Sequence, residues 1–154
     1  TLDDYAWLDD FNLKVMAALR LSLLIIPLMK YRGGGAIVNA SITCVKVPNA
    51  GSLPTSVMRS AGLNLTKSLA HEFASEGIRV NAICIEKIKS MQWVRRAADG
   101  DPTDIYQSFS KLVSMGRVGE ADEYADLVAF LSSARALYIT GTAINLDGGS
   151  CPVL

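Results

Sequence analysis

The chain of 154 residues has the length of one ordinary globular domain, and half of its residues are hydrophobic. Fifteen basic and fifteen acidic side chains balance one another, which excludes the basic field typical of a nucleic-acid-binding protein. The widely spaced Cys44, Cys84 and Cys151, with the single histidine His71, predict reduced thiols in a cytoplasmic protein rather than a disulfide framework or a metal site.

The first expected element is a long helix from Asp3 to Lys30, along which apolar residues recur at three- and four-residue steps. Its most apolar run, Leu21–Met29, is far shorter than the ~20 residues that a membrane span needs, so we expect no membrane segment. The glycines at 33–35 end this helix, and Ala36–Ser41 is predicted to be a buried strand.

A second helix is expected between Ser52, as its N-cap, and Gly77, as its C-terminal stop, with Pro54 in the first turn. The stripe of apolar residues that should face the core consists of Val57, Ala61, Leu65, Leu69 and Phe73. Ile78–Ile85 follows as a second buried strand.

The remaining third of the chain starts irregularly, with a short helix expected from Thr103 to Val113. Gly119–Ser133 is predicted to be a helix, because its early acidic residues suit the positive end of a helix dipole. Thr142–Gly149 is the third predicted strand. The alternation of helices and strands predicts an α/β fold with parallel strands and with the long helices on the two faces of the sheet.

No nucleotide-binding motif is visible in the sequence. A dinucleotide fingerprint must follow a strand and open a helix, whereas the glycines at 33–35 follow a helix and precede a strand. These glycines therefore indicate a turn rather than a phosphate cradle.

Four blocks occur in a fixed order: GGGAIVNAS at 33–41, AGLNLTKSLAHEFASEGIRVNAI at 61–83, GRVGEADEYADLVAFLSS at 116–133 and YITGTAINLDGG at 138–149. Together they resemble the C-terminal half of a short-chain dehydrogenase/reductase. The resemblance implies one truncated domain over residues 1–154, with a Rossmann-like parallel sheet of which about three strands are present. It also implies NAD or NADP as the cofactor, although the family binds it mainly on strands that precede this sequence, so the chain alone is not expected to bind it.

The resemblance further implies a catalytic tetrad of asparagine, serine, tyrosine and lysine. Asn12 matches the family's asparagine, while Ser56 and Ser60 stand where the tyrosine and the lysine belong. The family's serine falls on Ile42 by the strand motif or on Thr43 by its spacing before Ser56. Ser60 carries no charge, and the pKa of a serine hydroxyl lies far above the ~10 of a tyrosine phenol, so we expect these positions to mark the lost chemistry rather than to perform it.

A second departure follows the strand Ile78–Ile85. Ile85 and Glu86 occupy the places of the family's Pro-Gly pair, whereas Ile88 and Ser90 keep the pattern whose members contact the nicotinamide amide. Some atypical family members carry a similar R-A-G helix start and an S-x-Q-W after this strand, and the stretches 59–62 (RSAG) and 90–93 (SMQW) resemble these. On the resemblance, Ile88 and Ser90 are the predicted cofactor-binding residues.

Three functions stay open at this point. The chain is a non-catalytic subunit of a homo-oligomer or of a hetero-oligomer with a related subunit, the substrate-side part of an oxidoreductase whose cofactor half lies elsewhere, or a binding protein without redox chemistry. An assembly is expected because the strand at 36–41 would otherwise expose an open edge. Neither nucleic acid nor a membrane is an expected partner.

Overall fold

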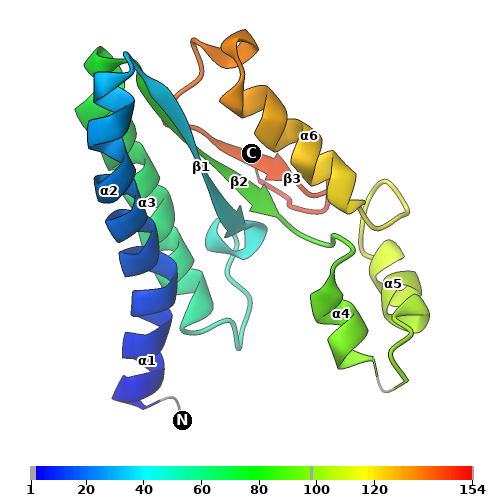
Figure 1. Cartoon of the computed structure of the whole chain (residues 1–154). Coiled ribbons are helices and arrows are strands. Elements are labelled where there is room, and N and C mark those ends of the chain that lie inside the picture. Colours follow the sequence, from blue (N-terminus) through cyan, green and yellow to red (C-terminus); the bar gives the residue numbers. More distant parts are fainter. Residues whose placement is uncertain (1–2, 98, 154) are drawn as a thin grey trace.

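The computed structural model describes residues 3–97 and 99–153, so the ends of the predicted unit 1–154 lie outside the described residues. Its centre is a parallel sheet with the strand order β1 (Gly35–Ile42), β2 (Ile78–Ile85) and β3 (Ala143–Leu146). Gly35 pairs with Ile78 and Ile42 with Ile85, so β1 and β2 end at the same edge of the sheet. Figure 1 shows helices on both faces of this sheet, which confirms the predicted α/β architecture.

The predicted N-terminal helix is present as α1 (Asp4–Phe11) and α2 (Ala17–Tyr31), joined without a break by a π-helical turn at Asn12–Met16. The helical periodicity did not indicate this turn, although such turns are frequent at functional sites. By length and hydropathy alone the continuous helix Asp4–Tyr31 could cross a membrane, a test that core helices of soluble proteins also pass. The short apolar run Leu21–Met29 therefore understated the length over which this helix is apolar.

The second helix, α3 (Thr55–Phe73), begins later than predicted. Pro54 occupies the N-cap position instead of Ser52, whose hydroxyl donates to the Asn49 carbonyl at 2.7 Å. The residue before a proline disfavours helical backbone, so the helix cannot extend back through Leu53. Its end agrees with the prediction: a 3-10 turn at Ala74–Glu76 leads to Gly77, which adopts φ 72°.

The predicted core stripe of α3 is wrong in its first half. Leu65, Leu69 and Phe73 do belong to the core that α2, α3 and the sheet share, but Val57 and Ala61 are exposed. The buried face instead includes Ser56 and Thr66. Polar residues are tolerated there because they are hydrogen bonded: the Asn39 amide donates to the Thr66 hydroxyl at 2.9 Å.

The opposite face of the sheet is covered by α6 (Ala121–Ser132), whose Leu131 packs with Ile83 and Ala136. Glu120 is its N-cap and forms a capping box with Glu123, as the early acidic residues indicated. Between β2 and α6 lie α4 (Met91–Arg96), which was not predicted, and α5 (Thr103–Ser110), which ends earlier than Val113.

The glycines at 33–35 fix the start of the sheet. Gly34 has φ 138°, and a Cβ on it would lie 2.7 Å from the Gly77 carbonyl oxygen. That carbonyl accepts the Gly35 N–H at 3.2 Å, which sets the register between β1 and β2. The glycine run is therefore a structural contact, in agreement with the absence of a nucleotide motif.

Gly34→Ala is expected to lower the free energy of unfolding by at least ~2 kcal/mol, because backbone strain and a backbone clash add. Gly100→Ala is the matched control, since Gly100 has φ 81° with nothing within 4 Å of the added Cβ. Urea unfolding gives the free energy of unfolding of both variants, and the difference between their losses measures the cost of the clash with Gly77. Equal destabilisation of the two variants would contradict the close approach of Gly34 to Gly77.

Candidate functional site

The two serines at the family's tyrosine and lysine positions are engaged locally. Ser56 is buried and its Oγ accepts from the Ser52 hydroxyl at 3.1 Å, while the Ser60 hydroxyl donates to the Ser56 carbonyl at 2.8 Å. Within residues 3–97 and 99–153, neither hydroxyl is hydrogen bonded to a carboxylate or an imidazole. Nothing in this arrangement activates either serine as a nucleophile.

Asn12 lies on the π-helical turn with its side chain exposed, and its carbonyl accepts the Ala17 N–H. Two residues further, Lys14 Nζ donates to Thr55 Oγ1 at 2.7 Å and to Asp10. The ammonium group of Lys14 thus lies beside Thr55, the residue that precedes Ser56. Sequence reasoning missed Lys14, since it stands at no position that the family motif assigns.

The densest group of functional side chains lies where β1 and β2 end. Thr43 directly follows β1 and Glu86 directly follows β2. Thr43 is buried, and its hydroxyl donates a hydrogen bond to Oε2 of Glu86. Lys87 Nζ donates to the other carboxylate oxygen of Glu86 at 2.6 Å. Ligands of open parallel sheets bind at the carboxyl ends of the strands, which is the position of this Thr43–Glu86–Lys87 cluster.

Two cavities meet at Glu86. The first, of about 240 Å³, is the substrate-side cavity, lined by Thr43, Cys44, Val47, Asn49, Glu86, Lys87, Leu112, Ser150, Cys151 and Pro152. The second, of about 360 Å³, is the Trp93 cavity, lined by Ile42, Ile85, Glu86, Ile88, Lys89, Ser90, Gln92, Trp93, Ala121 and Tyr124. The predicted pair Ile88 and Ser90 is thus brought together in one cavity, and Thr43 lies in its neighbour.

The Trp93 cavity has the character of a small-molecule site. It is mainly apolar and aromatic, with few polar groups, and its volume lies in the range of ~300–1,000 Å³ that is usual for ligand pockets. Trp93 is held in place because its Nε1–H donates to the Ile88 carbonyl at 3.1 Å. The Ser90 backbone N–H donates to the Tyr106 hydroxyl at 3.3 Å, and among the residues that the structure describes the Ser90 hydroxyl makes no hydrogen bond. These residues fit the flat, largely apolar ring and the amide of a nicotinamide.

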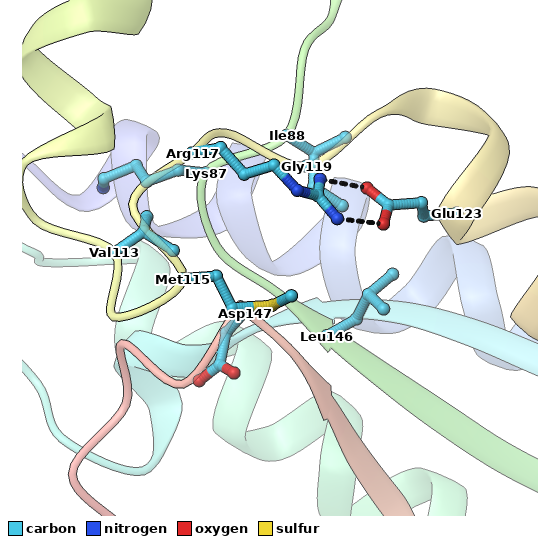
Figure 2. Close-up of a pocket in the computed structure, with 10 residues that line it drawn as sticks. Lys87, Ile88, Val113, Met115, Arg117, Gly119, Glu123, Leu146 and Asp147 are labelled. Carbon is cyan, nitrogen blue, oxygen red and sulfur yellow. Dashed lines mark hydrogen bonds and ion pairs between the residues drawn. The ribbon is translucent and has the colours of Figure 1, made fainter.

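A smaller cavity of about 80 Å³ is shown in Figure 2. It shares Lys87 with the substrate-side cavity and Ile88 with the Trp93 cavity. Arg117 and Glu123 form a bidentate ion pair at its rim, with N–O distances of 2.8 and 2.7 Å. The hydrogen bonds from Arg117, and then the Glu120 N–H, lower the pKa of Glu123 to about 2. The pair ties the start of α6 to the loop that precedes it.

Glu123→Gln is expected to reduce thermal stability at pH 7 by a few degrees and to have a much smaller effect near pH 2. The folded pKa is depressed, so the stabilisation is complete above the unfolded pKa of ~4.3 and is lost as the pH falls through about 2. Melting curves of both proteins at pH 7, 4 and 2 measure this. A difference in melting temperature as large at pH 2 as at pH 7 would contradict the ion-pair origin.

The structure separates the residues that the sequence grouped. Thr43 and Ile42, the two positions considered for the family's serine, line different cavities: Thr43 lines the substrate-side cavity and Ile42 the Trp93 cavity. Ser56 and Ser60 line a further concavity formed with the loop at 48–53. Sequence reasoning noticed Glu86 only as a departure from a Pro-Gly pair, although its place directly after a strand was itself a signal.

Comparison with known proteins supports the architecture. Residues 1–150 match the sequence model of a family described as enoyl-(acyl carrier protein) reductase. The chain is 34% identical over 152 residues to 2-keto-3-deoxy-L-fuconate dehydrogenase of Xanthomonas campestris, covering 96% of this chain and 50% of that protein. It spans about half the length of the curated relatives that it matches.

Solved structures agree with this relationship. L-sorbose reductase of Gluconobacter frateurii, complexed with NADPH and L-sorbose, superposes with a TM-score of 0.92 at 32% identity, covering 99% of this chain and 61% of the reductase. An NADPH-bound short-chain oxidoreductase of Pseudomonas aeruginosa with an atypical catalytic centre gives 0.91 at 30% identity, covering 99% and 60%. With the matched sequence blocks and the parallel sheet, these similarities show that the chain belongs to the short-chain dehydrogenase/reductase family.

Proposed function

We propose that this chain forms the substrate side of an NAD(P)-dependent oxidoreductase with an atypical catalytic centre. The observation that carries the proposal is the pair of cavities that share Glu86 at the carboxyl ends of β1 and β2. A redox site of this kind needs one space for a hydride carrier, an adjoining space for a substrate and a proton-transfer group between them. The Thr43–Glu86–Lys87 cluster has that position.

A nicotinamide dinucleotide, when bound, supplies hydride chemistry. On this chain Ile88, Ser90 and Trp93 would hold its nicotinamide end, and two solved structures similar to this chain were determined with NADPH. Lys89 also lines the Trp93 cavity, and its ammonium group pairs with Glu120 at 2.5 Å.

The proposed substrates are small polyhydroxy carbonyl compounds and their alcohols. The substrate-side cavity presents hydroxyl, amide, carboxylate and ammonium groups from Thr43, Asn49, Glu86, Lys87 and Ser150, which suit a ligand with several hydroxyl groups. L-sorbose and a 2-keto-3-deoxy sugar acid, named for two relatives, belong to this class.

A second candidate is a non-catalytic subunit in a cytoplasmic homo-oligomer, or in a hetero-oligomer with a related subunit, without nucleic acid or membrane partners. It is favoured by the apolar side chains that α2 exposes, with Leu21 67%, Leu24 74% and Leu28 59% exposed. The replacement of the tyrosine and the lysine by Ser56 and Ser60 also suits a subunit without activity. The three unpaired cysteines agree with a reducing compartment.

Turnover separates the two candidates. The protein, expressed in its full natural length, is incubated with L-sorbose and NADPH or NADH, and with sorbitol and NADP⁺ or NAD⁺, while absorbance of the reduced nicotinamide is followed. The oxidoreductase predicts turnover with at least one pair. The subunit candidate predicts no turnover by this protein alone, together with a rise in melting temperature when a related active subunit is added.

A further inference from the structure

We propose that Glu86 is the proton-transfer group of this site and that it acts through the hydroxyl of Thr43. This inference rests on the proposed oxidoreductase function and assigns the role that the family gives to its tyrosine. It is carried by the hydrogen bond from Thr43 to Glu86 and by the place of Glu86 in the wall of both cavities.

The sheet itself brings the two residues together. Ile42 and Ile85 are paired at the ends of β1 and β2, so the next residues, Thr43 and Glu86, leave the sheet side by side. Thr43 is 5% exposed and its hydroxyl is directed to Glu86, while the Glu86 side chain is 24% exposed. The carboxylate therefore contacts a buried hydroxyl at one oxygen and stays accessible to solvent protons.

Lys87 positions the carboxylate. Its ammonium group donates to Glu86 Oε1 at 2.6 Å and lies 5.0 Å from the centre of the Phe109 ring, which restricts the lysine side chain. Glu86 Oε2 is left to accept from Thr43. A carboxylate with one oxygen held by a cation and the other bonded to a hydroxyl is arranged to receive a proton from that hydroxyl.

The step balances in the direction of alcohol oxidation. The substrate O–H bond breaks and its proton passes to Thr43 Oγ1, while the Thr43 hydroxyl proton passes to Glu86 Oε2. The hydride that leaves the substrate carbon with its electron pair, as that carbon becomes a carbonyl carbon, would be accepted by an oxidised nicotinamide dinucleotide held by Ile88, Ser90 and Trp93. Glu86 then returns the proton to solvent, and carbonyl reduction follows the reverse course.

Charged and titratable groups surround Glu86 in both cavities. Lys87, Cys44 and Cys151 line the substrate-side cavity with it, and Lys89 and Tyr124 line the Trp93 cavity with it. Oxidation requires Glu86 as a base and carbonyl reduction requires it as an acid, so removal of its carboxylate should slow both directions.

Cys44 offers a readout that needs no turnover. Burial raises the pKa of its thiol, and the negative charge of Glu86 raises it further, against the lowering effects of Arg59, Lys14 and Lys87. Glu86→Gln removes the negative charge, so the thiolate fraction at pH 8 should grow and Cys44 should react faster with iodoacetamide. The rate is measured by mass spectrometry of the peptide that contains Cys44.

The test compares Glu86→Gln and Glu86→Asp with the control Glu76→Gln. Glu76 also pairs with a lysine, Lys30, at 2.7 Å, but lies just before β2, at the opposite end of the strand from Glu86. Turnover of sorbitol with NADP⁺ and of L-sorbose with NADPH is measured between pH 5 and 10. Glu86→Gln is expected to lower turnover by a factor of about 10²–10⁴ in both directions. Glu86→Asp should restore part of the rate, and Glu76→Gln should match the wild type.

Three results overturn the inference, and they are distinguishable. Unchanged turnover in Glu86→Gln, with an active wild type, refutes the role of Glu86 and leaves the oxidoreductase function intact. An unchanged Cys44 rate in Glu86→Gln shows that the carboxylate does not lie beside this turn in solution. A wild type inactive with all of the sugar and nucleotide pairs refutes the proposed function, and the inference with it, even where Cys44 responds.

Discussion

Replacing Arg79 with methionine is expected to lower the free energy of unfolding by about 3 kcal/mol. Arg79 is 8% exposed within the central strand β2. Its guanidinium donates to the Leu131 carbonyl at 2.6 Å and to the Ser133 carbonyl at 3.2 Å. These bonds satisfy the free carbonyls at the C-terminal end of α6, where a positive charge also complements the helix dipole.

Urea unfolding followed by circular dichroism gives the free-energy change. Arg135→Met is the control, because Arg135 lies at the same helix end but is exposed and stacks only on Phe130. The control should change stability by less than ~0.5 kcal/mol. Similar losses in both variants would show that Arg79 contributes only as a surface charge.

Replacing Asn81 with alanine is expected to cost about 3 kcal/mol and to loosen β3 from the sheet. Asn81 is 1% exposed, and its amide nitrogen donates to the Ile139 carbonyl at 2.9 Å. Its oxygen accepts from the Thr142 backbone N–H at 3.2 Å and from the Thr142 hydroxyl at 3.0 Å. One side chain thereby holds the segment that leads into β3.

Hydrogen exchange of the backbone amides at 142–146 reports this loosening. These amides should exchange faster in Asn81→Ala, while those of β1 keep their protection. Asn39→Ala is the control, since Asn39 makes one side-chain bond, to Thr66, and should cost about 1 kcal/mol. Equal protection of β3 in the wild type and in Asn81→Ala would refute the role of Asn81.

These two residues show where sequence reasoning succeeded and where it stopped. The bounds Ile78–Ile85 of β2 were predicted correctly, because a run rich in apolar and β-branched residues is typical of a buried parallel strand. The roles of Arg79 and Asn81 inside that run were not predictable. Their partners lie 52 and 58 residues away along the chain, beyond the reach of local periodicity.

The same limit applies to the candidate site. Ile88 and Ser90 line one cavity, and the family pattern places them within three residues of each other, while their contact with a cofactor stays a prediction. The contact between Thr43 and Glu86 spans 43 residues and depends on the register of β1 against β2. Sequence alone predicted two parallel, buried strands; β2 is buried, whereas β1 is mostly half-buried, and the sequence did not show which residues their ends bring together.

The fluorescence of Trp93 tests the central claim, that the cavity of Ile88, Ser90 and Trp93 receives the nicotinamide end of a dinucleotide. The sequence holds two tryptophans, so a Trp7→Phe background of the full-length protein leaves Trp93 as the reporter from this chain. Titration with NADPH should quench Trp93 emission and saturate, because the ring would lie against the nicotinamide. Trp93 emission that stays constant through saturating NADPH and NADH would contradict this account.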